Sequence, residues 1–131
     1  MVEIDEREPA AELRAPTILV CDDEPSLREL VRAVLGPRYR FAEVDDGHGV
    51  LPLVRELRPD LLVLDLMLPG LSGIDVLAEI RGDRELASLP VVVVTAWNHA
   101  EGSALAAGAD RFVSKPFDPD ELTAAVEELL R

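Results

Sequence analysis

The sequence predicts an α/β fold with a doubly wound, five-stranded parallel sheet and helices on both faces. Two observations predict it. Short aliphatic runs alternate five times with segments of helical periodicity, which is typical of strands joined by crossover helices. The central runs are almost continuously apolar, as in "LLVLDLMLPG" at 61–70, and such strands are buried on both faces. A chain of 131 residues fits one domain of this kind.

Five segments have the length and composition of strands. They are "TILVC" (17–21), "YRFAEV" (39–44), "DLLVLD" (60–65), "PVVVVT" (90–95) and "RFVS" (111–114). The second has one wetter face, which suits the edge of a sheet. With right-handed crossovers this predicts the strand order 2-1-3-4-5, a flavodoxin-like arrangement. In such a sheet the functional crevice opens beyond the carboxyl ends of strands one and three.

The helices are expected at 25–36, 48–58, 72–81, about 99–107, and from Pro119 onward. Gly36 and Gly108 stop two of them, Ser72 is an N-cap, and Asp118 opens a capping box completed by Glu121. Because Pro52 lacks an N–H, its helix is expected to begin late or bend. The residues expected to face inward are Leu27, Leu30, Val31, Val34, Leu35, Val50, Leu51, Val54, Leu57, Ile74, Leu77, Ala78, Leu122, Val126 and Leu129.

Charge and targeting signals exclude several classes of function. The net charge of −13 repels phosphate backbones and anionic lipids, so we expect neither direct nucleic-acid binding nor membrane binding. Residues 1–16 hold five acidic and two basic residues without periodicity, and we expect a flexible acidic leader there. This leader lacks the features of a secretory signal, and no apolar run is long enough for a membrane span. These features favour a soluble cytoplasmic protein.

Polar side chains follow four of the predicted strands at the point where each strand ends. Asp22 and Asp23 follow the first strand, Asp65 ends the third, Thr95 ends the fourth, and Lys115 follows the fifth. Each residue alone has an ordinary structural explanation, such as a helix cap, a strand threonine or a solvated lysine. Their occurrence at one edge of the sheet instead predicts a common site, and it explains why a buried strand carries Asp65.

The expected cluster needs a counter-charge. At ~4 Å and an effective dielectric constant near 20, each pair of like charges costs about 4 kcal/mol. Three carboxylates therefore exceed what Lys115 can balance. Hard oxygen ligands favour Mg²⁺, with Mn²⁺ as an alternative. A carboxylate-held cation beside an ammonium and a hydroxyl suits a phosphoryl group, and an ionised Asp65 would be the nucleophile that forms an acyl phosphate.

Four motifs resemble those of the receiver domains of bacterial two-component response regulators (the CheY-like superfamily). They are "LVCDDE", "LLVLDLMLPGLSG", "VVVVTA" and "FVSKPF", and the resemblance covers residues 17–131. It implies that the chain is a phosphorylation-activated switch rather than a dedicated enzyme, catalysing only its own phosphoryl transfer and slow autodephosphorylation. The implied phosphodonor is a sensor histidine kinase or a phosphotransfer protein. The implied output partners are a downstream protein target, an output domain missing from this chain, or a second copy of the chain in a homodimer.

The resemblance also implies a role for individual residues. Asp65 matches the phosphoacceptor. Asp23 matches the direct metal ligand and Asp22 a ligand that acts mostly through water, while Met67 would give its backbone carbonyl to the metal.

Further roles follow from the same resemblance. Thr95 and Lys115 would hold the phosphoryl oxygens, and the Lys115–Pro116 peptide would be cis. Phe112 matches the switch aromatic, which turns inward when Thr95 moves toward the phosphoryl group.

Two features of this chain call for separate hypotheses. Thr95 and Lys115 lie 20 positions apart, slightly fewer than in typical relatives, so the helix within 96–108 is expected to be short or displaced. Met67 and Trp97 each lie two positions beyond a site residue. We hypothesise that both screen attacking water and lengthen the phosphorylated lifetime; the alternative is that Trp97 lies loosely on the surface.

Two other functions share parts of the pattern. A magnesium-dependent phosphohydrolase of the haloacid type also forms an aspartyl phosphate, but it needs Asp-x-Asp on one strand, and Leu66 and Met67 follow Asp65 here. A flavin-binding protein of the same topology needs a phosphate-cradling loop after the first strand. The acidic "CDDEPS" at 21–26 would repel that phosphate.

Overall fold

The computed structural model describes residues 15–131, and within them it has the predicted sheet. All strand pairs are parallel and the order is β2-β1-β3-β4-β5. The strands are β1 (Thr17–Cys21), β2 (Arg40–Val44), β3 (Leu61–Leu64), β4 (Val91–Thr95) and β5 (Arg111–Ser114). Each lies within a predicted strand or matches it. The predicted leader lies outside the described residues except for its last two positions, 15 and 16.

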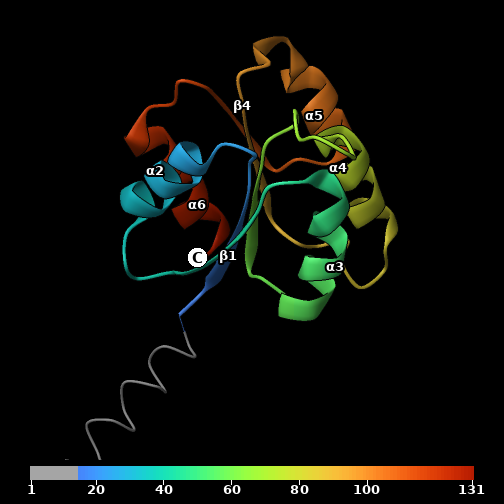
Figure 1. The fold of residues 1–131 in the computed structure, drawn as a ribbon, viewed down its shortest axis with the longest axis horizontal. Helices are drawn as coiled ribbons and strands as arrows, with labels where there is room; N and C mark the ends of the chain where they lie inside the picture. The colour runs from blue at the N-terminus through green and yellow to red at the C-terminus, as the bar shows by residue number, and fades with distance from the viewer. Residues whose placement is uncertain (1–14) are drawn as a thin grey trace, which may run out of the picture.

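Helices cover both faces of the sheet (Figure 1). The helical segments are α2 (Pro25–Leu35), α3 (Gly47–Leu57), α4 (Gly73–Gly82), the 3₁₀ turn η1 (Asn98–Ala100), α5 (Glu101–Ala107) and α6 (Pro119–Leu129). Helices α2 and α6 pack on one face, and α3, α4 and α5 on the other. Among residues 15–131, none of these helices has the length and apolarity to cross a membrane.

The two faces have separate hydrophobic cores because alternate side chains of a strand point in opposite directions. On β1, Ile18 and Val20 join the core under α2 and α6, while Leu19 and Cys21 join the core under α3, α4 and α5. All four are at most 1% exposed. Burial on both faces is the physical reason that the central strands are aliphatic throughout.

The helix caps agree largely with the prediction. The side chain of Ser72 accepts a hydrogen bond from the backbone N–H of Asp75, and Gly108 ends α5 in the left-handed region at φ 113°. Asp118 caps α6 through the N–H of Asp120, one position earlier than the capping box requires. Helix α5 has 7 residues, so the predicted short helix is confirmed.

The late start expected of the Pro52 helix is wrong. Helix α3 begins at Gly47, and Pro52 lies inside it. A proline in that position removes its own bond to the carbonyl of the residue four before it and crowds that carbonyl, but the bonds of the other residues in the helix can still form. The cap from Asp46 to the N–H of His48 and the buried Val50 and Val54 hold the first turns in place.

Three residues predicted to face inward are exposed: Leu30, Leu57 and Ala78. Leu30 is 47% exposed because the buried stripe of α2 is centred on Val31 and Leu35. On α4 the buried stripe consists of Val76, Leu77 and Ile80, which leaves Ala78 outside it. Periodicity identified these helices correctly, but it predicted buried faces that are wider than the ones in the structure.

Candidate functional site

The predicted site residues come together at the carboxyl edge of the sheet. Asp22 and Asp65 follow β1 and β3, which are neighbours, with Cys21 paired to Leu64 in register. The backbone N–H of Asp65 donates to the carbonyl of Cys21 at 3.0 Å, so the two strands leave the sheet at the same level. The parallel ladder therefore brings two aspartates 43 positions apart in sequence into one pocket.

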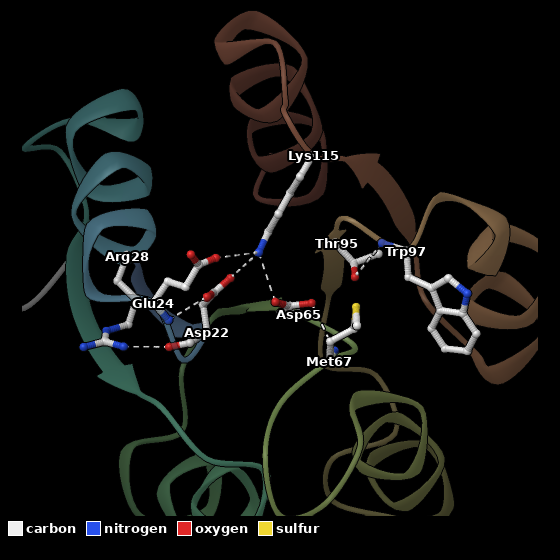
Figure 2. Close-up of polar contacts among 8 residues, drawn as sticks. All are labelled: Asp22, Glu24, Arg28, Asp65, Met67, Thr95, Trp97 and Lys115. Atoms are coloured by element: carbon white, nitrogen blue, oxygen red, sulfur yellow. Dashed lines mark hydrogen bonds and ion pairs between the residues drawn. The ribbon is translucent and has the colours of Figure 1, made fainter.

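Lys115 lies at the centre of an ion-pair cluster (Figure 2). Its Nζ is 2.8 Å from Asp22 Oδ2, 3.0 Å from Asp65 Oδ2 and 4.0 Å from Glu24 Oε1. Asp22 is 4% exposed and Asp65 is 5% exposed, whereas Glu24 lies in solvent. Two carboxylates buried this deeply need charged partners, and Lys115 is their shared partner.

Burial and charge act in opposite directions on this cluster. Burial raises the pKa of the Asp22 carboxyl group above its ordinary value, although hydrogen bonds from Lys115 and from the N–H of Glu24 lower it in part. Burial lowers the pKa of Lys115, but its hydrogen bonds to Asp22 and Asp65 outweigh that effect and leave the pKa raised. Lys115 is thus held as a cation, while the carboxylates around it remain in excess.

The carboxylates are close enough to share a cation. Asp22, Asp23 and Asp65 can each offer one oxygen such that these atoms all lie within 4.8 Å of one another. Asp22 and Asp65 are buried, and Asp23 faces solvent. Three hard oxygen donors with open access on one side fit Mg²⁺, which keeps several of its waters when bound to protein. The grouping expected from the sequence is present in the structure.

The second oxygen of Asp65 contacts the following loop. Asp65 Oδ1 accepts a hydrogen bond from the backbone N–H of Met67 at 3.0 Å, as Figure 2 shows. The Met67 side chain is 59% exposed, so it lies over the surface of the pocket and not in the core. Both oxygens of Asp65 therefore have defined hydrogen-bond partners.

Thr95 approaches the pocket from β4. It is fully buried, and its hydroxyl accepts a hydrogen bond from the backbone N–H of Trp97 at 3.3 Å. Its carbonyl accepts from the N–H of Lys115 at 2.9 Å, which joins the ends of β4 and β5. Trp97 is 48% exposed. Figure 2 shows Met67 and Trp97 on the same side of the pocket, remote from Asp22.

The predicted switch aromatic and cis peptide lie near the same edge. Phe112 is half-buried on β5 and packs against the core under α3, α4 and α5. The Lys115–Pro116 peptide is cis, as expected. The structure therefore places Phe112 on the strand that carries Lys115, three positions before it.

Three residues of the site region were missed in the sequence. Glu24 reaches Lys115, and Arg28 donates from Nη1 to the backbone carbonyl of Asp22 at 2.7 Å. Arg28 also pairs with Glu43 of β2, Nε to Oε1, at 2.7 Å. A charged residue on a helix usually faces solvent, so periodicity gave no sign of Arg28. Its position one turn into the helix after the acidic pair was the available signal.

Comparisons with known proteins identify the family. Residues 18–127 match the response regulator receiver domain family. The chain is 48% identical over 117 residues to the DNA-binding response regulator MtrA of Mycolicibacterium smegmatis, covering 87% of this chain and 50% of MtrA. It is 34% identical over 118 residues to the phosphate regulon transcriptional regulatory protein PhoB of Pseudomonas aeruginosa, covering 88% of this chain and 52% of PhoB.

Solved structures agree with this assignment. The receiver domain of NtrX from Brucella abortus superimposes with a TM-score of 0.77 at 34% identity, covering 86% of this chain and 97% of that one. The chain spans about half the length of the curated relatives MtrA and PhoB. From the matched motifs, the fold and the acidic pocket together, we conclude that this chain belongs to the response regulator receiver domains, which are phosphorylation-activated signalling switches.

Proposed function

We propose that this receiver takes a phosphoryl group onto Asp65 from a phosphohistidine of a sensor histidine kinase or phosphotransfer protein, in a reaction that requires Mg²⁺. The observation that carries the proposal is the buried cluster in which Lys115 bridges Asp22 and Asp65. An excess of carboxylate beside an ammonium suits a divalent cation and a phosphoryl group together.

The carboxylates of Asp22, Asp23 and Asp65 would hold the cation, with the backbone carbonyl of Met67 as a further ligand. Mg²⁺, or Mn²⁺ in its place, supplies positive charge that neutralises phosphoryl oxygens. Lys115 already contacts Asp65, so its ammonium is in position to pair with a phosphoryl oxygen once one is attached there.

The transfer itself needs little covalent chemistry from the protein. A carboxylate oxygen of Asp65 attacks phosphorus, a P–O bond forms, and the P–N bond to the donor imidazole breaks. The electron pair of that bond stays on the imidazole nitrogen, which then takes up a proton. Burial of Asp65 limits the access of water to the new acyl phosphate, so we expect slow hydrolysis rather than turnover.

The output is a changed surface. In our proposal the hydroxyl of Thr95 leaves the N–H of Trp97 and bonds the phosphoryl group, and Phe112 turns inward behind it. Because its curated relatives include a DNA-binding regulator twice its length, we propose that the changed face acts on an output domain, a protein target or a second copy. The strongly acidic surface argues against direct DNA contact by this domain. We place it in the cytoplasm by its family.

Labelling with acetyl phosphate tests the proposal. Intact-protein mass spectrometry should show one phosphoryl group per chain in the presence of Mg²⁺ and none after chelation. Asp65→Asn should abolish labelling. Asp75→Asn, which removes an exposed acidic side chain from the first turn of α4, should leave it intact. Labelling of Asp65→Asn would contradict the assignment, and sustained turnover of a generic phosphate ester would favour the phosphohydrolase instead.

A further inference from the structure

We infer that Arg28 is a positioning residue for the cation site, acting through the backbone of Asp22. The inference rests on the proposed function and deepens it, because it assigns the control of cation affinity to a side chain on α2 that contacts no carboxylate of the pocket.

Asp22 is held at every polar atom. Its N–H donates to the carbonyl of Val44 at 3.1 Å, and its carbonyl accepts from Arg28 Nη1 at 2.7 Å. Its Oδ1 accepts from the N–H of Glu24 at 2.9 Å, and its Oδ2 from Lys115. The Asp22 carbonyl lies just beyond the end of β1, so it does not take part in the hydrogen-bond ladder of the sheet. Arg28 donates the hydrogen bond that this carbonyl would otherwise lack.

Arg28 is itself anchored. Its Nε donates to Glu43 Oε1 at 2.7 Å, and the other carboxylate oxygen of Glu43 pairs with Arg32 at 2.5 Å. The Arg28 side chain is only 15% exposed, whereas that of Arg32 is 53% exposed. A planar guanidinium with two fixed partners has little conformational freedom. Arg28 therefore holds the backbone carbonyl of Asp22 at a fixed position relative to Glu43 of β2. Figure 2 shows Arg28 to the left of Asp22, on the side away from Lys115.

The charge of Arg28 and its hydrogen bond to Asp22 should have opposite effects on Mg²⁺ affinity. A guanidinium near a cation site repels the cation, so loss of its charge alone would tighten Mg²⁺ binding. Loss of the hydrogen bond would let Asp22 and its neighbour Asp23 move, which weakens binding because the ligands must then be ordered by the cation. Glu43, which Arg28 shares with Arg32, offsets part of the charge of Arg28, so we expect the positioning effect to be the larger one.

The test is the Mg²⁺ affinity of the unphosphorylated protein, measured by calorimetry. Arg28→Gln should raise the dissociation constant by about tenfold, the usual effect of losing a group that orients a metal ligand. Arg32→Gln is the matched control, since it removes the same charge from the same helix and also breaks a pair with Glu43, but has no bond to Asp22. It should stay within about twofold of wild type, because exposed charges are screened by salt.

Arg28→Lys separates position from charge and also serves if Arg28→Gln fails to fold. A lysine keeps the charge but cannot bond both Glu43 and the carbonyl of Asp22 in the same fork. We expect weakened Mg²⁺ binding by this variant too, with circular dichroism unchanged from wild type. Wild-type affinity in Arg28→Lys, or affinity in Arg28→Gln equal to or tighter than in Arg32→Gln, would overturn the inference.

The two proposals fail in different ways. If the wild type binds no Mg²⁺ and takes no label from acetyl phosphate, the proposed function is wrong. If the wild type does both and the Arg28 variants bind Mg²⁺ as it does, only the positioning role is wrong.

Discussion

The ammonium of Lys115 lies 3.0 Å from a carboxylate oxygen of Asp65, although the two residues are 50 positions apart in the chain. The same ammonium holds Asp22 at 2.8 Å. One ammonium thus neutralises part of the charge of two buried carboxylates. The stability of the domain and its affinity for a divalent cation should therefore depend on the same side chain.

Replacement of Lys115 by methionine should destabilise the domain and make it depend on Mg²⁺. The substitution leaves Asp22 and Asp65 as buried like charges without their partner. We expect a loss of about 2 kcal/mol in the free energy of unfolding without Mg²⁺, somewhat below the cost of breaking a fully buried pair. Added Mg²⁺ should stabilise the variant more than the wild type. Urea denaturation with and without Mg²⁺ measures both effects.

Arg38→Met is the matched control for this experiment. Arg38 pairs with Glu127 on the surface and its side chain is 57% exposed. Solvent screens an exposed pair, so the loss should be small and unaffected by Mg²⁺. Equal losses in the two variants would show that the cluster at Lys115 has no special role in stability.

Replacement of Trp97 by glutamate should shorten the phosphorylated lifetime. Trp97 flanks Thr95 and lies on the same side of the pocket as Met67, where apolar groups can screen the acyl phosphate from water. An acidic side chain can instead bind and orient a water molecule. We expect phosphate release to become about three- to tenfold faster, a barrier change of roughly 1 kcal/mol. Release of inorganic phosphate after labelling is the measurement.

Leu105→Glu provides the comparison for Trp97→Glu. Leu105 is an exposed apolar residue of α5, so the change in polarity is similar but lies away from Thr95. Its rate should match the wild type. If Trp97→Glu also releases phosphate at the wild-type rate, Trp97 is only a surface residue.

The pH dependence of stability should report the pair between Arg28 and Glu43. The hydrogen bond from Arg28 lowers the pKa of Glu43, with Arg32 adding to the effect and burial opposing it. The folded pKa is therefore below the unfolded value, near 4.5 for an ordinary glutamate. The carboxylate stabilises the fold above the unfolded pKa, and this stability is lost as the pH falls through the folded pKa.

Glu43→Gln isolates that contribution. The variant should be less stable than the wild type by about 0.5–1 kcal/mol at neutral pH, since the pair is partly open to solvent. The difference should shrink as the solution is acidified below the ordinary glutamate pKa. Urea denaturation across this pH range measures it, and a difference that stays constant with pH would contradict the assigned cause.

Gly47 should be intolerant of any side chain. A Cβ atom there would lie 1.7 Å from the carbonyl oxygen of Leu71, and the N–H of Gly47 donates to the carbonyl of Pro69. The contact packs the start of α3 against the loop that follows Asp65. Gly47→Ala should cost about 2 kcal/mol or more, within the range of overpacked cores, and thermal unfolding is the readout.

Gly102 is the corresponding control. It lies within α5 and a Cβ there would meet nothing within 4 Å. Gly102→Ala should stabilise the domain by roughly 0.5–1 kcal/mol, because alanine loses less backbone entropy in a helix than glycine does. A similar loss in both variants would mean that the contact at Gly47 does not limit stability.

Strand prediction succeeded here because burial on both faces leaves a short aliphatic run rich in β-branched residues. The run at 90–95 predicted such a strand, and β4 is completely buried. Helix existence was equally clear, but the edges of apolar faces were not. Leu30 and Ala78 fall on the expected stripes and still face solvent, because the neighbouring elements decide how far around a helix the core extends.

The site was predictable to the extent that topology determined it. In a parallel sheet every strand delivers its last residue to the same edge, so Asp22, Asp65, Thr95 and Lys115 could be placed together from strand order alone. Arg28 and Glu43 could not, since their pairing depends on the distance between a helix and an edge strand. Thr95 shows the same limit, because its hydroxyl bonds Trp97 here and no sequence pattern indicates that contact.

The amino-acid sequence by itself determined which residues meet at this edge. Its hydrophobic pattern identifies the strands, and the composition of the strands indicates their order in the sheet. Only the tertiary structure decided how they meet: that Lys115 bridges two carboxylates, that Asp23 faces solvent, and that Arg28 holds the backbone beneath Asp22. The physical reason is that hydrogen bonds and ion pairs depend on ångström-scale distances between elements. The packing of side chains sets these distances, and the hydrophobic pattern that predicts the fold does not specify them.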